Sequence, residues 1–127
     1  MATHGLSMRI LLVEDHADSA SVTKRLLELN NYSVVVAANA KEARTRCTAN
    51  DGFDLLLCDI GLPDEDGWLL IRDLLSGYVP KAIAYSGLTG PEDIEKSIQA
   101  GCIAHLSKPI KFDALLSAIR GSMPTES

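Results

Sequence analysis

The chain has 127 residues and a mass of 13.7 kDa, a length that suits one domain and leaves no room for a second of ordinary size. A hydrophobic fraction of 46% with 23% charged residues is ordinary for a globular protein and excludes a disordered chain. The net charge is −5, and the acids are concentrated: residues 47–71 hold six and residues 10–23 hold three, with no Lys or Arg in either stretch. Such an acidic surface disfavours nucleic acid as a partner.

The cysteines and the start of the chain predict a cellular compartment. Cys47, Cys58 and Cys102 form an odd set without C-x-x-C spacing, which favours buried thiols in a reducing compartment over disulfides or a zinc site. The chain has no apolar run of membrane-spanning length and no signal-peptide pattern, so we expect a cytoplasmic protein without membrane contact. Residues 1–7 precede a second methionine and are expected to be an N-terminal tail or a linker remnant.

Short apolar runs alternate along the chain with segments of helical periodicity. Three of the five runs are almost wholly apolar, as expected for parallel strands covered on both faces. This strict alternation predicts an α/β fold in which an open parallel sheet lies between two layers of helices. In chain order, the expected elements are strand 8–13, helix 18–29, strand 32–37, helix 40–49, strand 54–58, helix 66–76, strand 82–85, helix 91–100, strand 102–106 and helix 111–120.

Two of the helices have apolar faces defined by widely spaced residues. Val22, Leu26 and Leu29 share one face of the first helix, and Ile94 and Ile98 share one face of the fourth. An apolar face of this kind packs on the core of a globular protein, so we expect these five side chains to face the sheet.

Polar side chains stand at the ends of the predicted strands. In an open parallel sheet the ligand site lies at these carboxyl ends. Glu14, Asp15 and Asp59 are three carboxylates that would repel one another in one crevice, and a hard divalent cation such as Mg²⁺ relieves that repulsion. Ser86 and Lys108 end or follow the fourth and fifth strands, and a hydroxyl and an ammonium group facing such a cation indicate a phosphoryl group between them.

The strand-end residues lie in four motifs, in this order: Val13-Glu14-Asp15, Asp59-Ile60-Gly61-Leu62-Pro63-Asp64-Glu65-Asp66-Gly67, Tyr85-Ser86-Gly87 and His105-Leu106-Ser107-Lys108-Pro109. Together they resemble the receiver domain of two-component response regulators, over about residues 8–120. The resemblance implies a flavodoxin-like (βα)5 fold with a doubly wound, five-stranded parallel sheet in the order 2-1-3-4-5. It also implies one receiver domain over residues 8–121, with a C-terminal tail at 122–127.

The resemblance assigns roles to the acids. Asp59 corresponds to the phosphoacceptor, which takes a phosphoryl group from the phosphohistidine of a histidine kinase or a histidine phosphotransfer domain. Glu14 and Asp15 correspond to the acidic pair of the family. With Asp59 and the backbone carbonyl of Gly61 they would complete the protein ligands of Mg²⁺. Such a domain catalyses its own phosphotransfer and dephosphorylation, so whether to class it as an enzyme stays open.

The remaining strand-end residues correspond to groups that surround the phosphoryl group in the family. Ser86 matches the hydroxyl that bonds it, Gly87 leaves room for it, and Lys108 pairs with one of its oxygens. The peptide bond between Lys108 and Pro109 is expected to be cis, a form that an X-Pro bond tolerates at low energetic cost.

His105 departs from the family pattern, which often has Tyr or Phe three positions before the lysine. That ring swings inward when the Ser or Thr moves toward phosphate, and we hypothesise that His105 fills this switch role. The alternative is a static, half-exposed histidine. Phosphorylation is expected to change the surface formed by the helix at 91–100, the strand at 102–106 and the helix at 111–120, which would contact a protein output partner.

Other polar and aromatic residues near the motifs have simpler interpretations. The acids at 64–66 are expected to be loop and N-cap residues rather than metal ligands. His16 is expected to flank the site at the surface, because Mg²⁺ prefers oxygen to imidazole. Trp68 and Tyr85 are expected to be packing residues rather than recognition anchors.

Several functional contexts stay open. Residues 86–110 look more like receivers attached to hybrid sensor histidine kinases, which favours a segment of such a kinase slightly over a free-standing regulator. Only six residues follow Gly121, so no output domain is expected. An aspartyl-phosphate hydrolase of the haloacid dehalogenase type would need an acid where this chain has Gly61. A flavin module would need a phosphate loop where Glu14 and Asp15 repel phosphate, and a degenerate receiver would lack acceptor residues that are all present.

Overall fold

The computed structural model describes residues 8–49, 52–87 and 89–121, so the expected tails at 1–7 and 122–127 lie outside the described residues. The longest helix has 13 residues, and none of the helices in the described ranges is long and apolar enough to cross a membrane. The elements, in chain order, are β1 (Arg9–Val13), α1 (Ala17–Leu29), β2 (Ser33–Ala37), α2 (Ala40–Ala49), β3 (Leu55–Asp59), α3 (Gly67–Leu75), β4 (Ala82–Ser86), α4 (Pro91–Ala100), β5 (Ala104–Ser107) and α5 (Phe112–Gly121).

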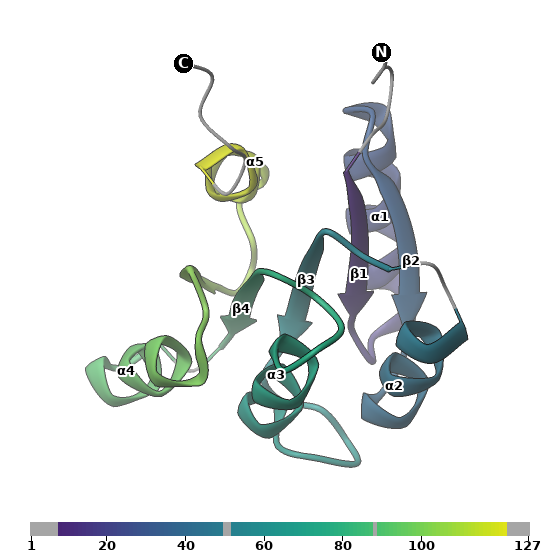
Figure 1. The fold of residues 1–127 in the computed structure, drawn as a ribbon. Coiled ribbons are helices and arrows are strands. Elements are labelled where there is room, and N and C mark those ends of the chain that lie inside the picture. Colours follow the sequence, from purple (N-terminus) through teal and green to yellow (C-terminus); the bar gives the residue numbers. More distant parts are fainter. Residues whose placement is uncertain (1–7, 50–51, 88, 122–127) are drawn as a thin grey trace, which may run out of the picture.

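The five strands form one parallel sheet in the order β2-β1-β3-β4-β5 (Figure 1). This order confirms the predicted 2-1-3-4-5 arrangement, and each expected element is present with bounds that differ by at most two residues. The order reverses between β1 and β3, which are neighbours in the sheet although they are not consecutive in the chain. A reversal of this kind opens a crevice at the carboxyl ends of the two strands.

The helices cover both faces of the sheet. Helices α2, α3 and α4 lie along one face, and α1 and α5 lie on the other (Figure 1). Every residue of β3 and β4 is buried, because alternate side chains point into the two helical layers. In β3, Leu56 and Cys58 join the core beneath α2–α4, whereas Leu55 and Leu57 join the core beneath α1 and α5.

Helix α1 does not bury the apolar face expected from its sequence. Val22 and Leu29 have exposed fractions of 59% and 70%, Leu26 is half-buried, and the buried residues are Ala20 and Leu27. Ala20 and Leu27 are seven residues apart, about two turns, so they lie on the same side of the helix. A small residue at one of these positions lets the helix approach the sheet closely, which leaves the Val22 side outside the core.

The expectation for α4 is wrong in the same way. Ile94 and Ile98 are exposed, and the helix buries Ser97 and Ala100 instead. The small buried side chains again bring the helix close to its neighbours, and two isoleucines are left at the surface. A polar residue, Ser97, is completely buried here, so its hydroxyl needs hydrogen-bond partners inside the protein.

The three cysteines are buried and free, as predicted. Burial raises the pKa of the Cys47 thiol and that of the Cys58 thiol, and it raises the pKa of Cys102 to about 12. A thiol must ionise to act as a nucleophile or metal ligand. These residues therefore act as small apolar side chains of the core.

Candidate functional site

The first part of the site lies where β1 and β3 end side by side. Val13 and Cys58 are partners in the sheet register, so the residues that follow them, Glu14 and Asp59, come to the same edge. Both are only 3% exposed. Two buried carboxylates at one edge need compensating charge or hydrogen bonds, because an isolated buried charge is strongly unfavourable.

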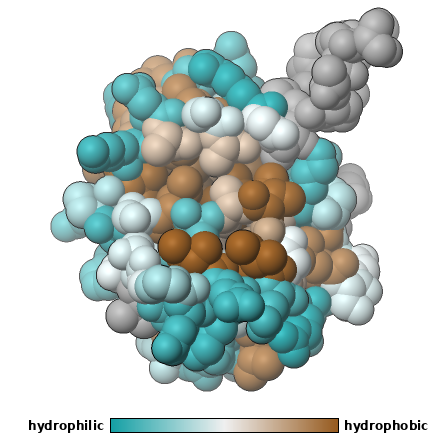
Figure 2. All heavy atoms as spheres, turned by 90° about the vertical axis from the view of Figure 1, so that its left-hand side faces the viewer, coloured by the Kyte–Doolittle hydropathy of each residue, from teal (hydrophilic) through white to brown (hydrophobic). Residues whose placement is uncertain are grey.

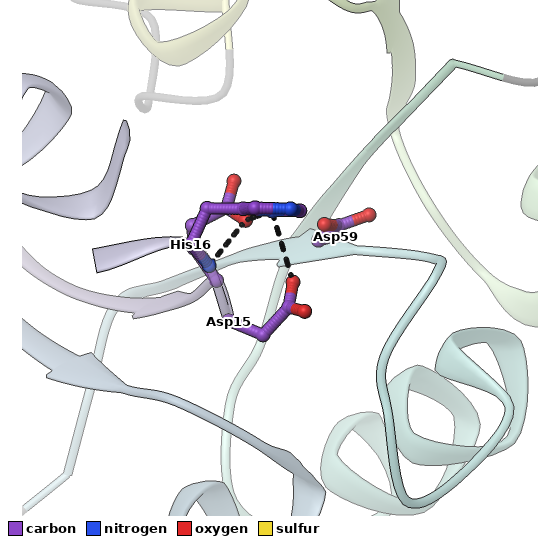
Figure 3. A group of neighbouring side chains, drawn as sticks. Asp15, His16 and Asp59 are labelled. Carbon is purple, nitrogen blue, oxygen red and sulfur yellow. Dashed lines mark hydrogen bonds and ion pairs between the residues drawn. The ribbon is translucent and has the colours of Figure 1, made fainter. Parts of the chain in front are cut away.

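Four residues at this edge have the arrangement of a cation site. Ligand-type atoms of Glu14, Asp15, His16 and Asp59 all lie within 4.8 Å of one another. Figure 3 shows the Asp15 carboxylate, the His16 ring and the Asp59 carboxylate gathered around one point. Asp15 Oδ1 is buried and has no hydrogen-bond partner among the described residues, although the His16 ring nitrogen lies 3.3 Å away, within ion-pair distance. A carboxylate-rich cluster with an unsatisfied oxygen fits Mg²⁺, which prefers oxygen ligands.

His16 flanks this cluster, as expected. Its ring is 70% exposed, and Nδ1 lies 3.1 Å from Glu14 Oε2 and 3.3 Å from Asp15 Oδ1. Its backbone N–H also donates to Glu14 Oε2 at 3.1 Å. The backbone contact helps to orient Glu14, and an exposed ring can move aside without disturbing the fold.

Lys108 supplies the positive charge of the site from the end of β5. Its Nζ lies 2.7 Å from Asp59 Oδ2 and 3.5 Å from Glu14 Oε1. Burial lowers the pKa of Lys108, but the hydrogen bond and charge of Asp59, followed by the charge of Glu14, outweigh this and raise the pKa above its usual value. Its backbone N–H donates to the carbonyl of Ser86 at 2.9 Å, which joins the ends of β4 and β5.

Tyr85 has a role at the site that its sequence position did not reveal. It is buried, as expected of a packing residue, but its hydroxyl donates to Glu14 Oε1 at 2.9 Å and lies 3.2 Å from the carbonyl of Val13. Burial and the nearby Glu14 charge raise the pKa of Tyr85, so the hydroxyl stays protonated and remains a donor. Tyr85 therefore helps to fix the position of Glu14.

The loop after Asp59 is shaped by two glycines. Gly61 donates its backbone N–H to Asp59 Oδ1 at 2.9 Å, which brings this part of the loop against the acid. At Gly67, a Cβ atom would lie 2.6 Å from the Cα of Ile60 and 2.9 Å from the carbonyl oxygen of Asp59. Backbone cannot be that close to a side chain, so only glycine lets α3 begin against the end of β3.

The acids at 64–66 are loop and capping residues, in line with their interpretation from sequence. Asp66 is the N-cap of α3 and accepts from the backbone N–H of Trp68 at 2.8 Å. Asp64 accepts from two backbone N–H groups at the start of α2, and Glu65 forms an ion pair with Arg44. Each of the three carboxylates has partners outside the cation cluster.

The other residues expected around a phosphoryl group also lie at this edge. Ser86 is 4% exposed at the end of β4. Gly87 is exposed, and a Cβ atom built there would meet nothing within 4 Å, so the space beside Ser86 is open. The Lys108–Pro109 peptide is cis, as the resemblance implied.

His105 is half-buried on β5 and is linked to two helices through one serine. The buried Ser97 hydroxyl on α4 lies 2.7 Å from His105 Nδ1, and Trp68 Nε1 on α3 donates to the same oxygen at 2.9 Å. Trp68 is also covered by the Lys96 ammonium group, 5.0 Å from its ring centroid. These contacts join α3, α4 and β5 at the residue for which a switch role was hypothesised.

A groove of about 350 Å³ opens beside the acids, between α1 and the segment after β5. Its lining includes Glu14, Tyr85 and Lys108 and the apolar residues Val22 and Ile110. Val22, which was expected to lie in the core, therefore lines this groove instead.

Comparison with known families identifies this arrangement. The family model described as response regulator receiver domain matches residues 10–120. The chain belongs to this family. Receiver domains act in two-component signalling, where they interact with histidine kinases or phosphotransfer proteins, and they generally bind Mg²⁺ at an acidic pocket. This chain has an acidic cluster, formed by Glu14, Asp15 and Asp59, at the carboxyl ends of its strands.

Individual relatives agree with this membership. An uncharacterized 14.6 kDa protein of Leptolyngbya boryana is 34% identical over 106 residues, covering 81% of this chain and 80% of the relative. The transcriptional regulatory protein KdpE of Staphylococcus aureus is 30% identical over 91% of this chain and 49% of its own length. The cell cycle response regulator CtrA of Brucella ovis is 29% identical over 88% of this chain and 48% of its own. The chain thus spans about half the length of these last two.

Solved structures show the same fold. The CheY-like receiver domain protein of Methanospirillum hungatei is 34% identical with a TM-score of 0.82, covering 91% of this chain and 93% of that chain. The signal receiver domain of an HD domain-containing protein from Pseudomonas fluorescens is 28% identical with a TM-score of 0.83, covering 92% and 94%. The receiver fold is therefore established for the described residues as a whole.

Proposed function

We propose that this receiver domain takes a phosphoryl group onto Asp59 from the phosphohistidine of a histidine kinase or a histidine phosphotransfer domain. A carboxylate oxygen of Asp59 attacks phosphorus, the new P–O bond forms as the P–N bond breaks, and the electron pair of that bond leaves on the imidazole. The observation that carries the proposal is the buried Asp59 carboxylate, with the Lys108 ammonium group 2.7 Å away and two further acids beside it. A carboxylate is a modest nucleophile, so positioning and charge supply the rate.

The residues at the strand ends would balance the charges of the reaction: the acids would bind the metal ion, and Lys108 would pair with the phosphoryl group. Glu14, Asp15, Asp59 and the Gly61 carbonyl would hold Mg²⁺, which, when bound, neutralises charge on the phosphoryl oxygens. Lys108 pairs with a phosphoryl oxygen from the opposite side. It is held beside the acids before the reaction, so little reorganisation is needed.

Two residues of β4 and its following loop would complete the phosphoryl site. The hydroxyl of Ser86 donates to a phosphoryl oxygen, and the open space at Gly87 admits the group. Because Ser86 is buried at the end of its strand, movement of this hydroxyl toward Asp59 would also move the loop that leads to α4. Phosphoryl contacts would thereby favour one of two conformations of the domain.

The surface that responds would be formed by α4, β5 and α5, and it would contact an output partner. Figure 2 views the molecule from the side on which α4 lies and shows apolar side chains gathered across this face. The exposed large apolar residues on or beside α4 and β5 are Ile94, Ile98 and Ile103. A receiver that displays such residues can present or withdraw an apolar contact surface when α4 moves.

His105 would act as the switch residue of this surface. Its bond to the buried Ser97 hydroxyl fixes the ring against α4 in the present structure. We expect a structure with a bound phosphoryl mimic to show the ring turned toward Ser86, with the 2.7 Å contact to Ser97 broken. A ring that keeps this contact in both structures would make His105 a static residue.

Docking of the phosphodonor would use the groove beside Lys108. Asp59 does not line this groove, but Lys108, which is bonded to Asp59, does, so a donor docked in the groove would bring its phosphohistidine beside the acceptor. Val22 lies at the side of the groove with 59% of its surface exposed, and apolar side chains at the rim of a narrow opening favour contact with an apolar partner surface. Val22, which α1 leaves exposed, would therefore contact the phosphodonor.

Val22→Lys is expected to slow phosphotransfer from a histidine phosphotransfer protein about tenfold, because a lysine must be desolvated when the partner docks. Labelling by acetyl phosphate should be unchanged, since a small donor needs no docking surface. Leu29→Lys is the matched control, because Leu29 is an exposed apolar residue of the same helix, about 10 Å further from the site. Equal slowing with both donors, or by both variants, would exclude this docking role.

We further propose that the domain works in the cytoplasm, in keeping with its three free, buried thiols. Its resemblance to receivers of hybrid kinases favours a place within a hybrid sensor histidine kinase over a free-standing regulator. An aspartyl-phosphate hydrolase is not supported, because Gly61 occupies the position where such an enzyme needs its second acid.

The proposed reaction is tested by incubating the purified chain with acetyl phosphate and following its intact mass. We expect the mass of one phosphoryl group to be added in the presence of Mg²⁺ and to be lost when the metal is removed by a chelator. Failure of the native chain to take up phosphate at any Mg²⁺ concentration would exclude the proposal.

A further inference from the structure

The loop that carries Gly61 contacts the core at Ile60 and Leu62, and the rest of it lies at the surface. It runs from Ile60 to Asp66, between β3 and α3, and the buried Ile60 donates its N–H to the carbonyl of Tyr85 on β4 at 3.1 Å. Beyond Ile60 the backbone contacts are local: Leu62 N–H donates to the carbonyl of Ile60 at 3.0 Å, Gly61 N–H donates to Asp59 Oδ1 at 2.9 Å, and Gly61 forms a β-bridge with Asp66 across the loop. Most of the loop, including Gly61 itself, is exposed or half-buried. A segment with few buried contacts opens more easily than the core unless a neighbouring element holds it.

The N-terminus of helix α2 binds this loop at Asp64. Asp64 accepts from the backbone N–H of Ala40 at 2.9 Å and from that of Lys41 at 3.1 Å. The hydrogen bond from Ala40 is the main cause that lowers the pKa of Asp64, so the carboxylate is charged at neutral pH. These two N–H groups belong to the first turn, where the helix offers no partners of its own. A residue 24 positions away in the chain therefore caps α2.

The same helix holds the next residue of the loop through Arg44, one turn further on. The guanidinium group donates to both carboxylate oxygens of Glu65, at 2.7 and 2.9 Å, and also to Asp73 of α3 at 2.5 Å. The hydrogen bond to Glu65 is the main cause that raises the pKa of Arg44. The guanidinium group is therefore a permanent cation. Two parallel hydrogen bonds fix the orientation of the Glu65 carboxylate as well as its distance from Arg44.

We propose that Arg44 is a positioning residue for the cation site: through Glu65 it holds the loop so that the Gly61 carbonyl stays in place to bind Mg²⁺. This inference rests on the proposed function, in which Gly61 is a metal ligand. Asp64 and Glu65 are consecutive, and both are bound by α2, so the loop is held as a unit from one side. Asp66 holds its other end by capping α3. Without the Arg44 contact, part of the Mg²⁺ binding energy would be spent on ordering the loop.

Arg44→Met is expected to raise the Mg²⁺ concentration for half-maximal labelling by acetyl phosphate about three- to tenfold, while the rate at saturating Mg²⁺ stays within about twofold of native. Isothermal titration with MgCl₂ should show the same weakening without any phosphodonor. In metal-free protein, the Gly61 and Leu62 amides should exchange with solvent several times faster. Glu65→Gln should reproduce these changes and serves as the second variant if Arg44→Met folds poorly.

Asp73→Asn is the matched control, because it removes the other partner of Arg44 and leaves the pair with Glu65 intact. It should behave as native in all three measurements. If the native chain is labelled but Arg44→Met and Glu65→Gln keep native Mg²⁺ affinity and amide exchange, the positioning role is wrong and the proposed function stands. If the native chain neither binds Mg²⁺ nor takes up phosphate, both are wrong.

Discussion

Asp59→Asn is expected to abolish phosphoryl incorporation from both acetyl phosphate and a phosphohistidine donor. The substitution keeps the shape of the side chain but replaces the attacking carboxylate by an amide, which is not a nucleophile at neutral pH. No other carboxylate of the site is equally placed, because Asp59 is the acid bonded to Lys108 at 2.7 Å and to the Gly61 N–H at 2.9 Å. Intact mass after incubation with acetyl phosphate and Mg²⁺ measures the loss.

The matched control for this variant is Asp113→Asn, which changes an exposed acid in the first turn of α5. It should be labelled like the native chain. A thermal melt of Asp59→Asn should remain a single cooperative transition, which would show that the lost labelling is not unfolding. Phosphate found in Asp59→Asn at the native level would place the acceptor on another residue and overturn the assignment.

The fold could be predicted because its signals are local and repeated. Buried parallel strands produce short apolar runs, and the run 54–58 corresponds to a strand, β3, in which every side chain is buried. The alternation of such runs with helices leaves few topologies to consider. The strand order is different, because no local pattern encodes it; it came from the resemblance and was confirmed by the sheet.

The site could be located for a related reason. Parallel strands bring their carboxyl ends to one edge, so residues as distant in the chain as Glu14, Asp59 and Lys108 become neighbours once the sheet is accepted. What the sequence could not supply is the geometry among them. The bond from Tyr85 to Glu14 depends on a side chain of β4 that reaches past β3 to the end of β1, and no spacing in the sequence encodes that contact.

The packing of α1 and α4 was predicted wrongly because periodicity finds a face but does not say which face is buried. On α1 the sheet is contacted by Ala20 and Leu27, and on α4 by residues that include Ser97, a polar side chain that hydropathy assigns to the surface. Ser97 can be buried because His105 and Trp68 both bond its hydroxyl. Those partners come from other elements, so only the tertiary structure shows that the serine is satisfied.

Lys108→Met should have the second large effect: we expect the rate of labelling by acetyl phosphate to fall about a hundredfold at saturating Mg²⁺, which is the usual cost of removing one group that stabilises transition-state charge. Methionine keeps most of the length of the side chain and removes the ammonium group, with its charge and its hydrogen-bond donors. At the same time the affinity for Mg²⁺ should rise, because Lys108 neutralises Asp59 and Glu14 in the present structure and competes with a bound cation. Tighter metal binding with slower phosphotransfer separates the two roles of this ammonium group.

Both quantities can be measured on one sample, by isothermal titration with MgCl₂ followed by a time course of intact mass. Lys111→Met is the control, since Lys111 is an exposed lysine three residues further along the chain and should leave both values unchanged. A damaged fold cannot imitate the expected result, because it would weaken metal binding along with the rate. If Lys108→Met is labelled within about twofold of the native rate, the contact of Lys108 with Asp59 stabilises the resting site only. Phosphoryl charge must then be neutralised by the metal without Lys108, with Ser86 as a hydrogen-bond donor.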